Sequence, residues 1–311
     1  MAVAPLFDIV SLGEAMVEFN QTGEGAGRLY LQGFGGDTSN FAIAASRQGA
    51  RVAYVSALGD DPYGRLLRQL WDDEGVDHAD VVTSADAFTA IYFVTHNEAG
   101  HHFSFFRSGS AASRMSPVQL PRERIASARL LHLSGISLAI SPAACDTAYA
   151  AIEIARQSGV KVSFDTNLRL KLWSIDRARA VMSDVVARSD LCLPSYDDMV
   201  AITGLTDPDA LVDHCLRLGA KVVALKLGDQ GALIADSSQR HRIPAHLCQP
   251  VDATGAGDTF GGAFVHRWLQ GDSLEQAGRY AAAAAALSTQ GYGAVAPIPS
   301  ATQVLGALHA A

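Results

Sequence analysis

The 311-residue chain has only four cysteines, Cys145, Cys192, Cys215 and Cys248, and no two of them form a Cys-x-x-Cys pair. This spacing excludes the usual zinc-ribbon and thiol-redox motifs and is typical of a reduced cytoplasmic chain. Positive charge is also scarce, since 24 Lys and Arg against 32 Asp and Glu give a net charge of −8. An acidic surface argues against nucleic acid or an anionic membrane as a partner, although a few local arginines can still hold an anionic small substrate.

Long apolar runs and a basic leader are missing as well. Residues 1–10 have no basic flank followed by a long apolar run, so we expect no signal peptide and a cytoplasmic location. The most apolar later stretch, Tyr280–Leu287, is far too short to span a bilayer. Its alanines, at 281–286, fit a closely packed helix. Apolar residues nevertheless make up 49% of the chain, which excludes a wholly disordered protein.

Apolar, β-branched runs alternate along the chain with longer helical patterns. Several of these runs are apolar at consecutive positions, which is typical of strands buried on both faces of a parallel sheet. We expect strands at Asp8–Gly13, Arg51–Leu58, Leu130–Ser134, Val160–Asp165, Asp190–Leu193 and Lys221–Leu227. We expect helices at Ser39–Gln48, Gly64–Glu74, Pro142–Gln157, Arg177–Val186 and Pro208–Leu218, many of them ending at a glycine C-cap. The sequence therefore predicts an α/β fold with an open, mostly parallel sheet flanked by helices, in a single domain over residues 1–311.

Two segments, at about residues 14–34 and 88–107, break this alternation. The first is Gly-rich, and the second alternates apolar and polar residues around Asn97–Gly100, which predicts a β-hairpin. We expect the two segments to form a small β lid over the main sheet. The alternation also leaves Phe93, Phe103 and Phe105 as an apolar face for a second subunit, so we expect a homodimer or higher homo-oligomer joined through the lids.

The most informative stretch is Val251–Ala263. A strand-like run ends near Val251, and a helical pattern follows from about Asp258 to Leu269. Gly255, Ala256 and Gly257 carry little or no side chain, so their backbone N–H groups can converge on an anion at a helix N-terminus. Asp258 would repel that anion, which makes sense if it is a general base that takes a proton from an attacking hydroxyl. The alternative is that Asp258 only caps the helix.

A second motif lies at Gly35–Asn40. A Gly-Gly turn that leads into a helix lets a polyhydroxylated ligand approach the backbone, and Asn40 offers both a donor and an acceptor to hydroxyl groups. The alternative is an ordinary turn before a helix N-cap at Ser39. Together, and in this order, the two motifs resemble those of the ribokinase-like (pfkB) carbohydrate kinases. The resemblance covers essentially the whole chain, and it implies transfer of a phosphoryl group from ATP, with Mg²⁺, to a sugar hydroxyl that Asp258 deprotonates.

The choice of sugar depends on two arginines. Arg107 ends the hairpin and Arg169 follows the strand that ends at Asp165, and two guanidinium groups at one end of a pocket would grip a carboxylate. The surrounding runs are most similar to those of 2-keto-3-deoxygluconate kinases. That resemblance implies substrate contacts from Gly36, Asn40, Tyr92, Phe106, Arg107, Arg169 and Asp258. Phe106 departs from relatives that carry Tyr, so a hydroxyl contact would be lost there.

Both arginines also have structural interpretations. Arg169 can form an ion pair with Asp165, and Arg107 can be a solvated hairpin end. The leading hypothesis is a 2-keto-3-deoxygluconate kinase with a sugar acid and ATP as ligands. The first alternative is the same chemistry on a neutral sugar, above all fructose, and the second is a sugar-binding regulator that has lost catalysis. Guanidinium groups that converge in the sugar pocket would favour the acid.

The nucleotide side is implied mainly by the resemblance. It places Lys226, Gly228, Gly231, Thr254, Gly255, Gly257 and Ser195 at ATP. Asp198 stands where relatives organise magnesium, so a contact through water is expected. Asp252, with carbonyls near Thr254, resembles the monovalent-cation site of some members, which makes K⁺ a candidate cofactor.

Overall fold

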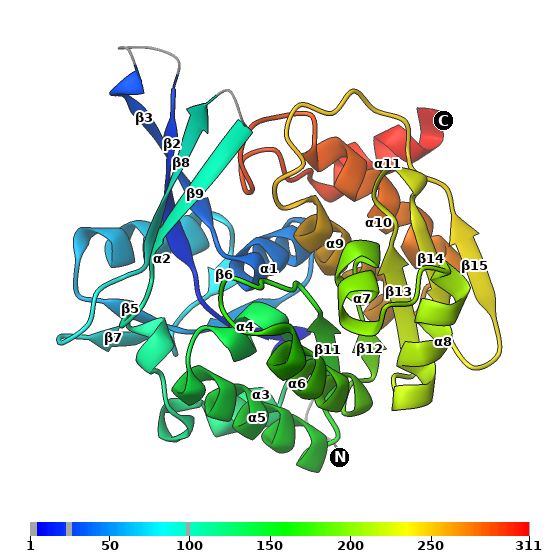
Figure 1. Cartoon of the computed structure of the whole chain (residues 1–311), viewed down its shortest axis with the longest axis horizontal. Helices are drawn as coiled ribbons and strands as arrows, with labels where there is room; N and C mark the ends of the chain where they lie inside the picture. The colour runs from blue at the N-terminus through cyan, green and yellow to red at the C-terminus, as the bar shows by residue number, and fades with distance from the viewer. Residues whose placement is uncertain (1–4, 23–26, 98–99, 311) are drawn as a thin grey trace.

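The computed structural model describes residues 5–22, 27–97 and 100–310 (Figure 1). Its main sheet has nine strands in the order β15-β14-β13-β12-β11-β10-β1-β4-β6. Neighbours from β6 to β13 pair in parallel, whereas β14 and β15 continue the sheet antiparallel. The expected open, mostly parallel sheet is therefore confirmed. The strands are β1 (Ile9–Leu12), β4 (Val52–Val55), β6 (Val76–Asp77), β10 (Leu130–Ser134), β11 (Lys161–Asp165), β12 (Leu191–Cys192), β13 (Val222–Lys226), β14 (Ala232–Ala235) and β15 (Arg240–Ile243).

Successive strand residues point to opposite sides of this sheet, so its apolar strands present apolar side chains on both faces. Helices cover both faces and bury these side chains. Ile9 and Leu130 belong to one apolar core, and Val10 and Leu131 to the other. The first core includes residues of α1 (Asp37–Arg47), α2 (Pro62–Asp73), α9 (Ala256–Gln270), α10 (Leu274–Ser288) and α11 (Ala301–Ala310). The second includes residues of α3 (Arg122–Ala126), α4 (Gly135–Ala139), α5 (Pro142–Gln157), α6 (Ile175–Ala187), α7 (Tyr196–Thr203) and α8 (Pro208–Leu218).

The element boundaries agree with the sequence patterns where a cap or a glycine marks them. Strand β10 and helices α5 and α8 have the expected ends, and Gly49, Gly75, Gly159 and Gly219 all have positive φ. The expected strand at residues 51–58 is instead two, β4 and β5 (Ala57–Gly59), the second of which pairs with β7 (Val82–Ser84). No strand ends near Val251, because residues 244–255 run as a loop after β15.

The lid is a four-stranded sheet in the order β3-β2-β8-β9, which projects beyond the main sheet at the upper left of Figure 1. It consists of β2 (Met16–Gln21), β3 (Tyr30–Gly35), β8 (Ile91–Asn97) and β9 (Gly100–Phe106). The expected β-hairpin is thus confirmed as β8 and β9, although residues 23–26 and 98–99 of the two segments lie outside the described part. The chain enters the lid after β1, leaves it after β3 to form α1, returns at β8 and leaves again after β9, so both lid segments start and end beside the body.

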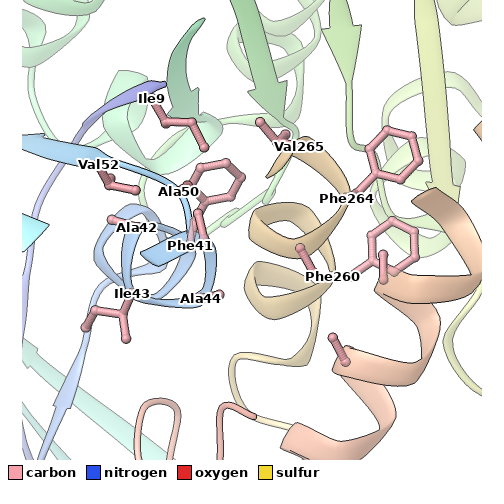
Figure 2. Packing of buried hydrophobic residues seen from close by; sticks show 14 of the residues in the cluster. Ile9, Phe41, Ala42, Ile43, Ala44, Ala50, Val52, Phe260, Phe264 and Val265 are labelled. Atoms are coloured by element: carbon pink, nitrogen blue, oxygen red, sulfur yellow. The ribbon is translucent and has the colours of Figure 1, made fainter. Parts of the chain in front are cut away.

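Helices α1 and α9 pack closely against each other, and Figure 2 shows Phe41 of α1 on the side of α9. A Cβ atom on Gly262 would lie only 2.6 Å from the carbonyl oxygen of Phe41, so this approach requires glycine there. Alanines 42, 44 and 45 of α1 are completely buried and keep that helix face small. The close packing fixes the N-terminal turn of α1 beside that of α9.

Two further features of the described residues concern membrane-spanning helices and disulfide bonds. None of the helices there combines the length and the apolar character that a membrane crossing needs. All four cysteines are free thiols. Because they are far apart and form no Cys-x-x-Cys pair, the simplest interpretation makes each of them a core residue. This holds for three, whereas Cys248 is only half-buried in the loop after β15.

Candidate active site

The site forms where the first turns of α1 and α9 meet. Asp258 lies in the first turn of α9, and its Oδ2 accepts a hydrogen bond of 2.9 Å from Nδ2 of Asn40 on α1. The N-cap of α9 is Gly255, and no side chain caps this helix, so the alternative role of Asp258 as a cap is wrong. Burial, followed by the negative charge of Asp37, raises the pKa of Asp258 to about 8. A carboxylate with so high a pKa is a strong base for a hydroxyl proton.

The N-terminus of α9 has the geometry of an anion site. Gly255 has a left-handed φ of 76°, and a Cβ atom there would lie 2.9 Å from the carbonyl oxygen of Ala294. The helix then begins at Ala256, whose own N–H donates to the carbonyl oxygen of Ala253 over 3.2 Å, while the N–H groups that follow it in the first turn have no acceptor four residues back within the helix. Lys226, at the end of β13, reaches the same turn, with its Nζ 3.5 Å from the position of a Cβ atom on Gly257. Unpaired N–H groups and an ammonium group together suit a phosphate.

Lys226 also forms a buried ion pair with Asp165, the last residue of β11. Only 15% of the Lys226 side chain and 8% of the Asp165 side chain are exposed. The structural interpretation of Arg169 as the partner of Asp165 is therefore wrong. Arg169 is exposed instead, and its Nη1 donates to the carbonyl oxygen of Leu168 over 2.8 Å.

The Gly-Gly turn leads directly into α1. Gly36 is the N-cap with a φ of 110°, and the helix begins at Asp37, so Ser39 is inside the helix rather than its cap. Ser39 accepts a hydrogen bond from Nε1 of Trp71, which anchors α2. Asn40 is 96% buried, and its Oδ1 has no hydrogen-bond partner among the described residues. A buried acceptor without a partner is costly, so this oxygen is ready for a donor from a ligand.

The lid contributes Tyr92, whose hydroxyl donates to Oε2 of Glu18 over 2.5 Å and lies against Gly35. The negative charges of Asp252 and Asp258 are among the causes that raise the pKa of Tyr92, after burial and Glu18. This face of the lid therefore looks toward the catalytic carboxylate.

Phe106 is on the other face of the lid. The β8–β9 register places Phe105 opposite Tyr92, and the two rings stack with their centroids 5.4 Å apart. Phe106 contacts Phe93 instead, with the centroids 5.9 Å apart, and 55% of it is exposed. The expected substrate contact from Phe106 does not fit this register, because successive strand residues alternate between faces. Phe105, which the sequence analysis assigned to an apolar face for a second subunit, is the aromatic residue beside Tyr92.

Arg107 is neither a solvated hairpin end nor a free guanidinium. Its Nη2 lies 2.5 Å from Oε2 of Glu14, whose side chain is completely buried. Ser110 donates to the other oxygen of Glu14 over 2.6 Å. The ion pair thus joins the residue where the chain enters the lid to the residue where it leaves.

The predicted nucleotide and metal positions lie on the segments that follow β12 and β13 and on the loop before α9. Gly228 begins a 3₁₀ turn after β13 and Gly231 follows it, both with positive φ. Ser195 caps α7 and accepts from the backbone N–H of Asp198, whose Oδ2 also accepts from Thr166 and from the backbone of Leu168, each over 3.0 Å.

Asp252 accepts hydrogen bonds from the backbone N–H groups of Thr254 and Gly293, each over 2.9 Å. Within the described ranges, no three His, Cys, Asp or Glu side chains gather as a metal site. The magnesium and potassium assignments therefore stay predictions.

Asp37 and Asn167 also belong to the site, although the sequence analysis did not name them as site residues. Oδ2 of Asp37 accepts a hydrogen bond of 2.8 Å from Nδ2 of Asn167, which belongs to the loop after β11. Their proximity to the two predicted motifs was the available signal, because Asp37 follows Gly36 and Asn167 lies two residues after Asp165.

The site thus combines a carboxylate base with an anion-binding helix N-terminus. It lies at the carboxyl ends of the strands of an α/β sheet, under a β lid, and this arrangement defines a kinase of the ribokinase-like class. Residues 6–301 match the family described as pfkB family carbohydrate kinase. Fructokinase-1 of Oryza sativa subsp. japonica is 35% identical, over 97% of this chain and 98% of its own.

Solved structures agree with this classification. The PfkB protein from Polaromonas sp. JS666 is 30% identical, with a TM-score of 0.87 over 97% of this chain and 99% of its own. Fructokinase from Vibrio cholerae O395, solved in a fructose, ADP and calcium ion bound form, is 27% identical, with a TM-score of 0.86 over 96% of this chain and 98% of its own. The chain belongs to the pfkB family of carbohydrate kinases and is a sugar kinase that transfers a phosphoryl group to an alcohol.

Proposed function

We propose that this kinase phosphorylates a neutral ketose, with fructose as the best candidate, at a primary hydroxyl and at the expense of ATP. The main support for this proposal is the partner of Arg107. A sugar acid needs a guanidinium whose charge is free to balance its carboxylate, whereas the charge of this guanidinium is balanced by the buried carboxylate of Glu14, which lies 2.5 Å from its Nη2. The buried Nε of Arg107 has no hydrogen-bond partner among the described residues and remains a donor for a neutral hydroxyl. Arg169 is exposed and bound to its neighbour's carbonyl group, so no second free guanidinium completes a grip.

The charge around the sugar motif supports the same choice. Asp37 and Asp258 form no ion pair with any described residue, and the two cations nearby are already paired, Arg107 with Glu14 and Lys226 with Asp165. A substrate carboxylate would face this surplus of negative charge in a site of low dielectric constant, where repulsion is strong. A neutral polyol would meet hydrogen-bond acceptors instead.

Each group then has a defined part in the transfer. Asp258 takes the proton of the attacking hydroxyl, and Asn40 orients both the carboxylate and the sugar. The N–H groups at Gly255–Gly257 and the ammonium of Lys226 bind the charge that develops on the transferred phosphoryl group. Mg²⁺, bound with ATP, supplies further neutralisation of the phosphate oxygens. Closure of the lid excludes water that would otherwise hydrolyse ATP.

The relatives support fructose rather than 2-keto-3-deoxygluconate. Two plant relatives, from Oryza sativa and Zea mays, are each 35% identical and are named fructokinase-1. These relatives give no support to the sequence-based assignment to 2-keto-3-deoxygluconate kinases. The free thiols are consistent with a reducing compartment, and we keep the cytoplasm as the proposed location.

An ATP-coupled assay over fructose, ribose, 2-keto-3-deoxygluconate and gluconate tests this proposal. We expect the highest kcat/KM for fructose, with the sugar acids at least tenfold lower. Turnover of 2-keto-3-deoxygluconate above that of fructose would restore the sugar-acid hypothesis. No turnover of any sugar, with fructose binding retained, would favour the non-catalytic regulator.

The two arginines provide a second test. If neither holds a substrate carboxylate, Arg169→Ala changes kcat/KM for fructose and for the acids by the same factor, less than about threefold, because an exposed group far from charge contributes little. A selective loss on the acids, of roughly ten- to a hundredfold, is what a lost charge-assisted hydrogen bond would cause. That selective loss would overturn the choice of a neutral sugar.

A further inference from the structure

The carboxylate of Asp37 occupies a fixed position next to the catalytic turn. Asp37 is the first residue of α1, directly after the Gly36 N-cap and one helical turn before Asn40. Its Oδ2 accepts the 2.8 Å hydrogen bond from Nδ2 of Asn167. Because α1 packs tightly on α9, a residue in this turn cannot move away from Asp258 without disturbing the helix contact.

Asn167 is itself held in an unusual conformation. It is the one non-glycine residue with a positive φ, 31°, in the part of the chain that the structure describes. Its backbone N–H donates to Oδ1 of Asp165 over 3.2 Å, and Asp165 is in turn held by Lys226. Strained backbone of this kind persists where the surroundings fix it and is concentrated at functional sites. The strain aims the amide of Asn167 at Asp37.

The four carboxylates of the site are paired in two different ways. Glu14 and Asp165 each have a cation, Arg107 and Lys226. Asp37 and Asp258 have none among the described residues, and each is held by a neutral asparagine amide, from Asn167 and Asn40 respectively. An amide fixes a carboxylate in place without cancelling its charge. The charge of Asp37 is therefore not neutralised by a cation of its own and raises the pKa of Asp258.

We propose that Asp37 is a positioning residue whose charge, fixed by the strained Asn167, strengthens Asp258 as the base of the phosphoryl transfer. The inference rests on the proposed role of Asp258. After burial, Asp37 is the largest cause that raises the pKa of Asp258. The other groups that face Asp258 are Asn40 on α1, which lowers that pKa, Asp165 on β11, which raises it, and Lys226 on β13, which lowers it.

Asp37→Asn tests this role with little change of shape, since its amide oxygen can still accept from Asn167. We expect the acid-side apparent pKa of kcat/KM for fructose to fall by roughly one pH unit, as for two interacting carboxylates. Asp37→Glu restores the charge and should return the profile most of the way. Asn167→Gly keeps the positive φ but removes the amide, so it should give a smaller shift in the same direction.

The matched control is Asp73→Asn on α2. Asp73 also accepts a hydrogen bond from a side-chain amide, Nε2 of Gln69 at 2.9 Å, but it lies on the exposed surface. Its substitution should leave the pH profile unchanged. A merely structural role of Asp37 would lower stability and kcat together and leave the apparent pKa in place.

A titration of the Asp258 carboxyl carbon by NMR separates this inference from the proposed function. The signal is assigned by its loss in Asp258→Asn, and it should titrate at lower pH in Asp37→Asn than in the wild type. If this shift is seen but fructose is not phosphorylated, the proposed function fails and the inference stands. If the Asp258 titration and the pH profile are the same in Asp37→Asn, in Asn167→Gly and in the wild type, the inference is wrong.

Discussion

Asp258 combines two properties that oppose each other in most proteins, a buried environment and a need to ionise. Burial and the charge of Asp37 raise its pKa to about 8, which makes the carboxylate a better base but costs stability when it is charged. Asn40 compensates in part with a hydrogen bond of 2.9 Å. At the scale of single residues, catalysis and stability are therefore coupled through this carboxyl group.

The kinetic consequence is tested by Asp258→Asn. The amide keeps the shape of the carboxyl group but cannot accept the hydroxyl proton, so kcat should fall by ~10²–10⁴-fold, the usual contribution of a general base. Sugar binding, measured by calorimetry, should change little. A kcat within a few-fold of the wild type would remove Asp258 from the role of base.

The stability consequence has a definite sign. Because the pKa of Asp258 is about 8 in the folded protein and near 3.8 when unfolded, the folded state binds more protons between these values. The contribution of this group to the free energy of unfolding therefore falls as pH rises from about 4 to 8.

Thermal unfolding of Asp258→Asn and the wild type measures this effect. The variant should gain stability relative to the wild type as pH rises from about 4 to 8, by at most about 1.4 kcal/mol per pH unit. Glu14, whose pKa burial also raises, contributes equally to both proteins and cancels, whereas the contribution of Asp165, which faces Asp258, changes together with that of Asp258. A difference that is constant over pH 4–8 would contradict the raised pKa.

At the scale of elements, the lid is fastened to the body by the Glu14–Arg107 ion pair, with Ser110 as a third member. Glu14 precedes β2 and Arg107 follows β9, so the pair clamps both roots of the four-stranded sheet. Burial raises the pKa of Glu14, against the opposing effect of Arg107. A buried pair of this kind fixes the geometry of the lid more than it adds net stability.

Glu14→Gln tests the clamp. Loss of the partner leaves the charge of Arg107 buried, at a cost of about 3–5 kcal/mol. We expect a higher KM for fructose and faster ATP hydrolysis without sugar, because a loosened lid admits water.

The control for this lid variant is Glu74→Gln, which breaks the Arg47–Glu74 pair of 2.6 Å in the body. It should lower stability without raising sugar-independent hydrolysis. Equal hydrolysis in both variants would show that the clamp does not govern the lid.

At the scale of the complete chain, the lid leaves an exposed apolar face. The strand registers divide the phenylalanines of the hairpin, so Phe93 packs on the face of Phe19, whereas Phe103 and Phe105 share the face of Tyr92 with Leu31. Leu31 is 64% exposed, Phe103 37% and Phe105 43%. Exposed apolar patches of this kind mark association surfaces, so we keep the proposal of a homodimer joined through the lids, now through Leu31 and Phe103, which lie two residues farther along this face than Tyr92 and Phe105.

Leu31→Glu tests the dimer without touching the catalytic turn. A charge at this position should convert a dimer to a monomer at micromolar concentration in light scattering. Leu247→Glu, at a residue of the body that is 95% exposed, is the control and should leave the dimer intact. A wild-type monomer at that concentration would end the dimer proposal.

Local sequence patterns were enough to predict the layered α/β fold and the two motifs of the site. Consecutive apolar residues in short runs, helical patterns and glycine C-caps are local features, because they depend on residues within one or two turns of each other. They were sufficient for β10, α5 and α8, for the hairpin of the lid, and for the positions of Asp258 and Asn40 within their helices. The family followed from the order of the two motifs.

The partners of the charged side chains, in contrast, became known only from the tertiary structure. Arg107 binds Glu14 rather than a substrate, Asp165 binds Lys226 rather than Arg169, and Asp37 meets Asn167. The lid register likewise moved Phe106 to the face opposite Tyr92. Ion pairs and sheet registers join segments far apart in the chain, and their partners depend on close packing such as that of α1 on α9. No local pattern encodes that choice, and for this reason the proposed substrate class changed once the fold was known.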